Sequence, residues 1–218
     1  MPPRGLEPSG ILLVDKPAGP TSFDVVAAVR RRTGARTGHA GTLDPFATGL
    51  LLVLSGRATR LQTRFVGLRK RYLTNVDLSA RTSTGDLEGE RVAEREPPAS
   101  DELEEAMRRL RGLVELPIPA ASAVKIGGER AYRLHRRGVA VEMPTRAMDI
   151  VELELRSYDD GVASLELLVS SGTYVRSIAD ALGGHCASLR RTEIGPFSVE
   201  EADAERMLSV DEALRRIR

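Results

Sequence analysis

The chain has 218 residues, of which 41% are apolar and 29% are charged, a composition typical of globular proteins. It is long enough for one large domain or two small ones, and no stretch approaches the ~20 apolar residues of a membrane span. The first ten residues lack the apolar core of a signal peptide, and a single cysteine, Cys186, excludes an internal disulfide and a cysteine metal cluster. These features favour a cytoplasmic protein.

The net charge of +1 is unevenly distributed along the chain. Residues 1–74 carry +8 and residues 106–146 carry +6, whereas residues 75–105 carry −7 and residues 147–218 carry −6. Two basic segments on one face would form an anion-binding surface. Arginine supplies 29 of the 32 basic residues. Arginine is the better phosphate-binding and base-stacking cation; a high-GC genome or a heat-adapted host is the alternative explanation for its preference over lysine, but it does not explain the clustering.

The first predicted elements are a strand and a helix. The apolar run GILLVD (10–15) predicts a short buried strand. Thr21 or Ser22 can cap a helix over FDVVAAVRRRT, and Gly34 ends it.

The middle of the chain predicts two further strands and a helix. GLLLVLSG (49–56) is typical of a buried strand, and the alternation in KRYLTNVDL (70–78) indicates a half-buried one. TSTGDLEGE (82–90) is a polar, turn-rich segment. Ser100 and Asp101 open an amphipathic helix over DELEEAMRRLRG.

The second half contains the longest strand patterns. SAVKI and a helix over ERAYRLHRRG flank the glycine pair 127–128. MDIVELELRSY and VASLELLVSS predict long strands joined by a hairpin at residues 159–161. TYVRSIADALGG and SVDEALRRIR predict two further helices. Strands and helices without regular βαβ alternation predict an α+β fold with a large antiparallel sheet, in one domain.

The segment GHAGTLDPFATG (38–49) is the densest candidate site. Its glycines permit unusual backbone angles and close approach to a ligand, and Pro45 constrains Asp44 toward extended geometry. The segment lies between a predicted helix and a buried strand, where a scaffold can present a loop. A plain tight turn, with Asp44 bonding its own backbone, is the alternative.

Other chemical groups give weaker signals. The three histidines, at 39, 135 and 185, have no metal-ligand spacing, and a structural role is the favoured interpretation of His135 and His185. Arg176 interrupts an apolar helix face, so an inward-facing side chain needs a carboxylate partner, for which Asp44 is a candidate; a solvent-facing arginine is the alternative. A basic pair adjoins an aromatic ring at Lys70, Arg71 and Tyr72. This combination suits phosphate contact with base stacking, and an edge strand with a core tyrosine is the alternative.

Several segments together resemble the TruB family of tRNA pseudouridine synthases. In chain order they are GILLVDKPAGPTSFDVV, GHAGTLDPFATGLLLVLSGRATR, KRYLTNVDLSARTSTGDLEGE, SAVKIGGERAYRLHRRG, SGTYVRSIADALG and LRRTEIGPFSVEEA. The resemblance runs from about residue 10 to residue 202. It implies the pseudouridine synthase fold, with a central, largely antiparallel mixed sheet flanked by helices.

The resemblance also implies roles for individual residues. Asp44 matches the catalytic aspartate, Tyr72 matches the tyrosine that stacks on the target base, and Arg176 matches the arginine that pairs with the aspartate. His39 matches a base-flipping histidine, and Leu189 matches a leucine of the uracil pocket. The implied substrate-binding residues are His39, Gly41, Thr42, Leu43, Tyr174, Leu189 and Lys16, the last belonging with Pro17 to a motif that supports the site.

The implied reaction is the isomerisation of uridine to pseudouridine at position 55 in the T loop of tRNA. No electrons are transferred and no group is added, so no cofactor or metal is expected. The expected partner is the T stem-loop of tRNA, without guide RNA or membrane, and the protein is expected to be a monomer. A tRNA chaperone, a guide-RNA-dependent relative and a scaffold without chemistry are the alternatives.

The sequence departs from the family at two places. Ala121 stands where the family usually has an aromatic residue before Ser122, which affects the contacts of that loop. The sequence ends soon after GPFSVEEA, whereas most members continue into a small RNA-binding domain, often of the PUA type. We therefore expect an N-terminal extension (1–9), a catalytic domain (10–202) and a short C-terminal helix (203–218) without a complete PUA-type domain.

Overall fold

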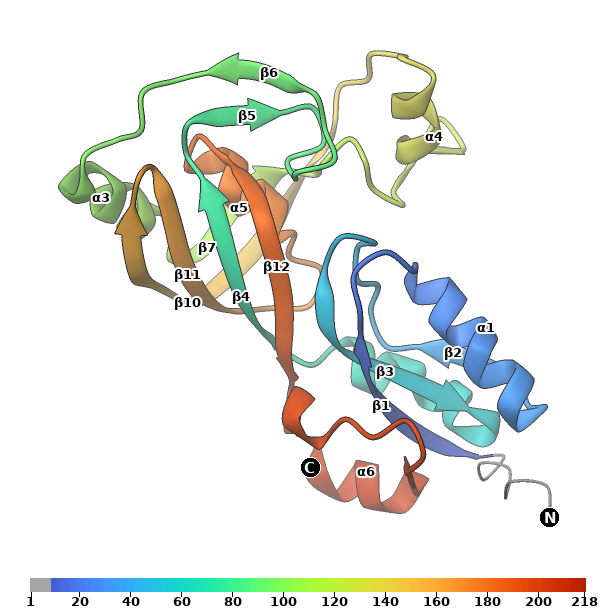
Figure 1. The fold of residues 1–218 in the computed structure, drawn as a ribbon. Coiled ribbons are helices and arrows are strands. Elements are labelled where there is room, and N and C mark those ends of the chain that lie inside the picture. The colour runs from blue at the N-terminus through green and yellow to red at the C-terminus, as the bar shows by residue number, and fades with distance from the viewer. Residues whose placement is uncertain (1–8) are drawn as a thin grey trace. The chain divides into compact units, whose positions relative to one another are not determined.

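The computed structural model describes residues 9–218, whose elements are traced in Figure 1. Within these residues, ten strands form one mixed, mostly antiparallel sheet, in which β3 (Thr48–Ser55) and β12 (His185–Ile194) are parallel. The predicted α+β class is confirmed. No helix in the described part of the chain is both long and apolar enough to cross a membrane. The predicted N-terminal extension lies outside the described residues except for Ser9.

The chain divides into two compact units, and two strands continue from one unit into the other. The described part of the first unit is residues 9–73 and 189–218, and the second unit is residues 74–188. The continuing strands are β4 (Lys70–Asp77) and β12.

The first unit is built on two apolar strands. Its elements are β1 (Gly10–Lys16), α1 (Ser22–Thr33), β2 (Thr37–His39), β3, the short 3₁₀ helix η1 (Gly56–Leu61), α2 (Gln62–Val66), β13 (Phe197–Ser198), the 3₁₀ turn η2 (Val199–Glu201), β14 (Met207–Leu208) and α6 (Val210–Arg216). Strand β1 pairs antiparallel with β3 from Gly10↔Ser55 to Lys16↔Gly49. Strand β14 pairs with β1, β2 pairs with β3, and β13 pairs with β12.

Strand β3 is buried on both faces, which explains its continuous apolar run. Leu51 and Val53 pack with Val26 and Val29 of α1. The alternate residues of β3 pack on the other side, in a core that includes Phe65, Phe197 and Ala213 of α6. Because side chains alternate along a strand, a single apolar sequence supplies both cores.

Helix α1 begins and ends as its sequence predicts. The Thr21 hydroxyl accepts a hydrogen bond from the Asp24 N–H at 3.1 Å, and the Asp24 carboxylate accepts one from the Thr21 N–H at 2.9 Å. Gly34 ends the helix with a φ of 64°, a left-handed conformation that favours glycine. The start of this helix lies against the loop that carries Asp44, because the Ser22 hydroxyl bonds to the main chain of Leu43.

The second unit contains the long hairpin and several short elements. They are the end of β4, β5 (Ala80–Thr82), β6 (Arg91–Glu94), α3 (Ser100–Leu110), β7 (Gly112–Pro117), β8 (Lys125–Ile126), β9 (Glu129–Arg130), α4 (Ala131–Arg136), β10 (Thr145–Asp159), β11 (Val162–Val169), α5 (Val175–Ala181) and the start of β12. The order of its main strands is β4-β11-β10-β7. The predicted hairpin is confirmed, with Asp160 and Gly161 at φ values of 46° and 77°.

Two details of the second unit differ from the prediction. Helix α3 has Ala99 as its N-cap, not Ser100 or Asp101, and the Glu102 carboxylate accepts a hydrogen bond from the Ala99 N–H at 3.0 Å. The side chain at the third helical position therefore satisfies the main-chain donor that precedes the helix. Strands β5, β6, β7 and β12 were not predicted, nor was β9, whose residues were expected to begin a helix.

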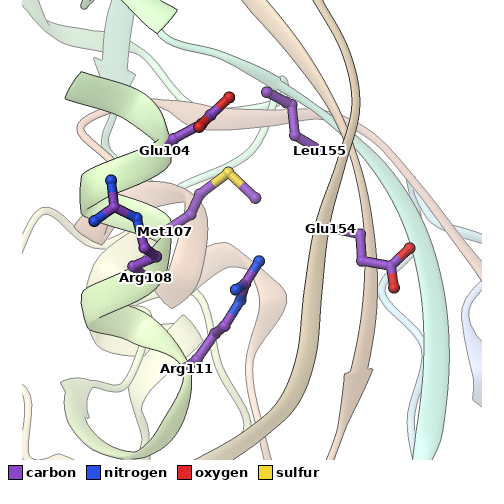
Figure 2. Close-up of a pocket in the computed structure, with 6 residues that line it drawn as sticks. All are labelled: Glu104, Met107, Arg108, Arg111, Glu154 and Leu155. Carbon is purple, nitrogen blue, oxygen red and sulfur yellow. The ribbon is translucent and has the colours of Figure 1, made fainter. Parts of the chain in front are cut away.

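A groove of about 390 Å³ lies between α3 and β10 (Figure 2). Its lining residues are Glu104, Met107, Arg108, Arg111, Glu154 and Leu155. The guanidinium of Arg111 donates to the Leu153 carbonyl at 2.8 Å and so ties the end of α3 to β10. None of the residues implicated by the sequence lines this groove.

Candidate active site

In the first unit, the loop that carries Asp44 connects β2 with β3. Asp44 is half-buried, and its carbonyl accepts a hydrogen bond from the Ala47 N–H at 3.2 Å, which closes a turn. Gly41 has a φ of 107°, a conformation that side-chain-bearing residues rarely adopt. The Ser22 hydroxyl donates to the Leu43 carbonyl at 2.9 Å and accepts from the Leu43 N–H at 2.8 Å. Helix α1 therefore anchors the residue that precedes Asp44.

Lys16 supports the other side of the same loop. Its side chain is fully buried, and Nζ donates to the carbonyls of Pro17, Pro20 and Pro45 at 2.7, 2.9 and 3.1 Å. Burial lowers the pKa of Lys16, an effect that the nearby charge of Asp44 opposes. Lys16 thus ties Pro17, Pro20 and Pro45 together through one buried ammonium group, and its role in supporting catalysis stays a prediction.

His39 ends β2, immediately before the loop. Burial and the charge of Arg191 both lower its pKa, burial more strongly. The neutral imidazole is therefore favoured near neutral pH. The His39 carbonyl accepts a hydrogen bond from the Gln62 amide at 2.7 Å, which fixes the main chain at the start of the loop. Thr42 is exposed on the loop, whereas Leu43 is buried.

The basic-aromatic run at residues 70–72 lies in β4 and faces largely inward. Lys70 is only 4% exposed, and Nζ donates to the carbonyls of Val66 and Leu68. Lys70 therefore does not make the phosphate contact that the sequence suggested. Tyr72 is also buried, as is Leu189 in β12. Their predicted contacts with the target base stay predictions.

In the second unit, Arg176 faces inward, so the solvent-facing alternative is wrong. Its side chain is 3% exposed and lies 3.3 Å from a carboxylate oxygen of Asp86. Its guanidinium also donates to the carbonyls of Thr84 and Ala121, at 2.9 and 3.1 Å. The contact at residue 121 is made by the main chain, so it does not depend on the aromatic side chain that the family usually has there.

Asp86 is held in place by the turn around it. Its carboxylate accepts hydrogen bonds from the Thr84 hydroxyl at 2.6 Å and the Glu88 N–H at 3.1 Å. Gly85 has a φ of 73°, and a Cβ there would lie 3.3 Å from the Cβ of Arg176. The turn-rich segment 82–90 thus provides a buried carboxylate for the arginine.

Comparison with known proteins decides the family. Residues 30–175 match the family described as "TruB family pseudouridylate synthase (N terminal domain)". The chain belongs to the TruB family. It is 44% identical over 214 residues to tRNA pseudouridine synthase B of Leifsonia xyli, covering 91% of this chain and 71% of that protein. It is also 44% identical over 213 residues to the protein of the same name from Thermobifida fusca, covering 88% and 72%.

A solved structure shows the same fold at lower identity. It is "Crystal structure of the archaeal box H/ACA sRNP Nop10-Cbf5 complex", with a TM-score of 0.63 and 26% identity. The match covers 88% of this chain and 49% of that one. The pseudouridine synthase fold that the sequence predicts is thereby confirmed.

The TruB match covers part of the candidate site. Residues 30–175 include Asp44, Tyr72 and Tyr174, and end one residue before Arg176. Tyr174 is the N-cap residue of α5, and the guanidinium carbon of Arg146 lies 5.7 Å from the centre of its ring. This cation–π contact places a positive charge at the motif that leads into Arg176.

Sequence reasoning missed Asp86 and Arg191, which lie in the TruB motifs, and Arg146, which contacts Tyr174 of another motif. Asp86 lies in a segment rich in acidic residues, and only its burial distinguishes it from them. A carboxylate two residues after Thr84, in a glycine-containing turn, was the available signal. Arg146 and Arg191 carried no local signal, since both belong to strands and their contacts are tertiary.

Proposed function

We propose that this chain converts uridine to pseudouridine at position 55 in the T loop of tRNA, with Asp44 as the essential catalytic residue. The observation that carries the proposal is the loop of Asp44. It has the GTLDP sequence and is fixed by Ser22 on one side of the aspartate and by Lys16 on the other. The 44% identity to two proteins named tRNA pseudouridine synthase B supports the choice of substrate.

The reaction rearranges one nucleotide without an added group. The bond from ribose C1′ to uracil N1 breaks, the base turns, and a bond forms from C1′ to C5. The proton on C5 is lost and N1 takes up a proton, so the atoms balance without an oxidant or a reductant. An ionised Asp44 would either take a proton from the sugar or attack it covalently, and both routes need the carboxylate beside the ribose.

Arg176 would orient this carboxylate. We infer that its guanidinium pairs with Asp44 during catalysis, and that Asp86 and the turn around it hold the guanidinium in position. A planar guanidinium can bind carboxylates through more than one N–H group, which suits a shared role between two aspartates. The geometry of Asp86 and Arg176 within the second unit supports the part of this proposal in which Asp86 holds the guanidinium.

RNA binding would rest on the basic segments and on stacking. Arg31 of α1 and Arg69 are exposed in the segment that carries +8. Such side chains displace counterions from RNA phosphates. Extruding the target uridine costs a few kcal/mol, and stacking on Tyr72 would offset about 1–3 kcal/mol. His39, held neutral by burial, is suited to the base-flipping role without adding a charge to the pocket.

We also propose that the protein acts alone, as a monomer in the cytoplasm, without guide RNA. The curated relatives at 44% identity carry the name of a tRNA enzyme, whereas the chain from the archaeal box H/ACA complex with Nop10 is only 26% identical. A tRNA chaperone role is compatible with the same binding surface. A chaperone role would need neither the fixed loop of Asp44 nor the buried ion pair of Arg176 and Asp86.

The test is to incubate the purified protein alone with an unmodified tRNA transcript and to map pseudouridine by position. We expect product at position 55 without added RNA or protein. An Asp44→Asn protein, folded as well as the wild type, serves as the control for the catalytic assignment. Binding without any product from the wild-type protein would favour the chaperone, and product only after addition of a guide RNA would favour the guide-dependent relative.

A further inference from the structure

The loop of Asp44 contacts a second buried cation in the first unit, Arg191. This side chain is 1% exposed. Its Nε donates to the Leu50 carbonyl at 2.7 Å, and its two terminal nitrogens donate to the carbonyls of Thr42 and Gly41, each at 3.2 Å. One guanidinium therefore joins the start of the loop to the strand that follows it.

The main chain of Arg191 is equally constrained. Arg191 is in parallel register with Gly49 at the start of β3. A Cβ on Gly49, which has a φ of 103°, would lie 2.2 Å from the Arg191 carbonyl oxygen. The absence of a side chain at residue 49 allows the main chain of β12 to lie this close to β3. The backbone from which the Arg191 side chain extends is therefore fixed.

A buried arginine with carbonyl partners has a defined mechanical effect. Burying the charge is unfavourable unless its N–H groups are bonded, and here main-chain oxygens supply the bonds. The N–H groups of a guanidinium point in fixed directions in one plane. The carbonyls of Gly41, Thr42 and Leu50 must therefore keep fixed relative positions, and Asp44 lies between the second and the third.

The charge of Arg191 also acts on its neighbours. It lowers the pKa of His39, Lys70 and Lys16, in each case in addition to the larger effect of burial. The loop thus lies among buried cations, and Arg191 contacts it at the residues before the aspartate while Lys16 contacts it at Pro45.

We propose that Arg191 is a positioning residue for Asp44: it fixes the Gly41–Thr42 main chain so that the carboxylate is presented at the reacting ribose. This rests on the proposed function, in which Asp44 is the catalytic group. Arg191 itself is enclosed and does not reach the substrate. Its removal should therefore slow the chemical step and leave RNA affinity almost unchanged, because small displacements of a catalytic group cost rate.

The experiment compares Arg191→Gln and Arg191→Lys with Arg190→Gln. Arg190 is the matched control, because it is the next residue of the same strand but is partly exposed and pairs with Asp15 at 2.8 Å. The measurements are the single-turnover rate at saturating tRNA, the dissociation constant for tRNA, and the thermal midpoint of each variant.

We expect Arg191→Gln to lower the single-turnover rate about 100-fold, with a dissociation constant within about twofold of wild type, since phosphate contacts provide most of the affinity. Arg191→Lys should recover part of the rate, because one ammonium can bond some of the three carbonyls. Arg190→Gln should stay within about twofold of wild type in both quantities, as expected for the loss of an exposed ion pair.

Three results would overturn the proposal. They are an unchanged rate in Arg191→Gln, a loss confined to tRNA affinity, and failure of both Arg191 variants to fold, which would give Arg191 a general stabilising role. Asp44→Asn is measured in parallel. If it is inactive while Arg191→Gln is fast, only the positioning role fails; if Asp44→Asn is itself active, the catalytic assignment under the proposed function fails.

Discussion

Each of the two units buries an arginine, and the two side chains are satisfied in different ways. In the second unit, Arg176 is 3% exposed, pairs with the buried carboxylate of Asp86 and also donates to two main-chain carbonyls, so its bonds include an ion pair. In the first unit, Arg191 is 1% exposed and bonds to three main-chain carbonyls. An ion pair fixes two side chains relative to each other, whereas carbonyl bonds fix the path of the main chain.

The difference separates two ways of arranging a catalytic carboxylate. The carbonyl-bonded arginine can hold the loop on which the carboxylate lies. The ion-paired arginine keeps a charged group oriented for a further partner, and Asp86 limits how far it can turn. If this distinction is right, breaking the ion pair should leave a buried charge without its partner and so lower stability. Breaking the carbonyl bonds should leave the catalytic loop less fixed and so lower the reaction rate.

The largest expected effect is on stability, from Asp86→Ala. This change removes a buried carboxylate beside Arg176, and breaking such a pair typically costs about 3–5 kcal/mol. Asp15→Ala is the matched control, because it also removes an aspartate from an arginine, but at an exposed site, where the cost is about 0–1 kcal/mol. The free energy of unfolding is measured in urea. Equal decreases in the free energy of unfolding of the two variants would show that the buried Asp86 pair contributes no more to stability than an exposed pair.

The next effect concerns turnover, in Arg176→Lys. An ammonium cannot reproduce the fork that binds Asp86 and two carbonyls, so the single-turnover rate should fall at least tenfold, or about 1.4 kcal/mol. Arg81→Lys is the control, since Arg81 forms an exposed two-point pair with Asp180 of the same helix α5. Wild-type rates in Arg176→Lys would show that the guanidinium geometry is not needed.

A smaller effect is a pH dependence that arises from Lys70 in the first unit. Burial and the charge of Arg191 lower the pKa of Lys70 to about 8, from an ordinary value of 10.5. Between these values the unfolded chain keeps the proton and the folded chain has lost it. Stability should therefore rise with pH in this window, by up to about 1.4 kcal/mol per pH unit, and the burial penalty is fully present below pH 8.

The variant Lys70→Met isolates the contribution of Lys70 to the pH dependence of stability. The variant lacks the hydrogen bonds to the Val66 and Leu68 carbonyls at every pH. The pH dependence of the difference in unfolding free energy between wild type and variant therefore comes from the titration of Lys70. Urea unfolding at several pH values from 7.5 to 10 measures it. A difference that stays flat across this range would mean that Lys70 keeps its ordinary pKa in the folded protein.

The smallest effect per residue is on RNA affinity. Arg31→Glu and Arg69→Glu should each weaken tRNA binding and reduce its salt dependence, because each removes about one phosphate contact. Arg215→Glu in α6 is the control, an exposed arginine outside the two basic segments. Affinity is measured from 50 to 200 mM salt. Equal effects of all three reversals would indicate a response to net charge alone.

Elements with a clear apolar pattern were predictable from the sequence. Strands β1 and β3, helix α1 and the β10–β11 hairpin follow from alternation, caps and the turn at residues 159–161. The GTLDP loop was found because glycines and a proline surround one carboxylate. These signals are local, so they require no knowledge of the rest of the fold.

Strand β12 and the contact of Arg176 with Asp86 could not be predicted, because their signals are tertiary. The run LRRTE reads as polar, yet Arg191 within it is buried by carbonyls from another part of the chain, which conceals the strand pattern. Asp86 looks like one acidic loop residue among several until its turn is folded beside Arg176. Lys70 reads as a phosphate contact for the same reason: its burial is invisible in the sequence.

The measurement that tests the central claim most directly is the single-turnover rate of pseudouridine formation by Asp44→Asn at saturating tRNA. The amide keeps the size of the side chain and removes its charge and basicity. We expect the rate to fall by at least about 1,000-fold, within the range for loss of a catalytic acid–base group, while the dissociation constant for tRNA stays within about twofold. A folded Asp44→Asn protein that retains a tenth of the wild-type rate would contradict the assignment of Asp44 as the catalytic residue.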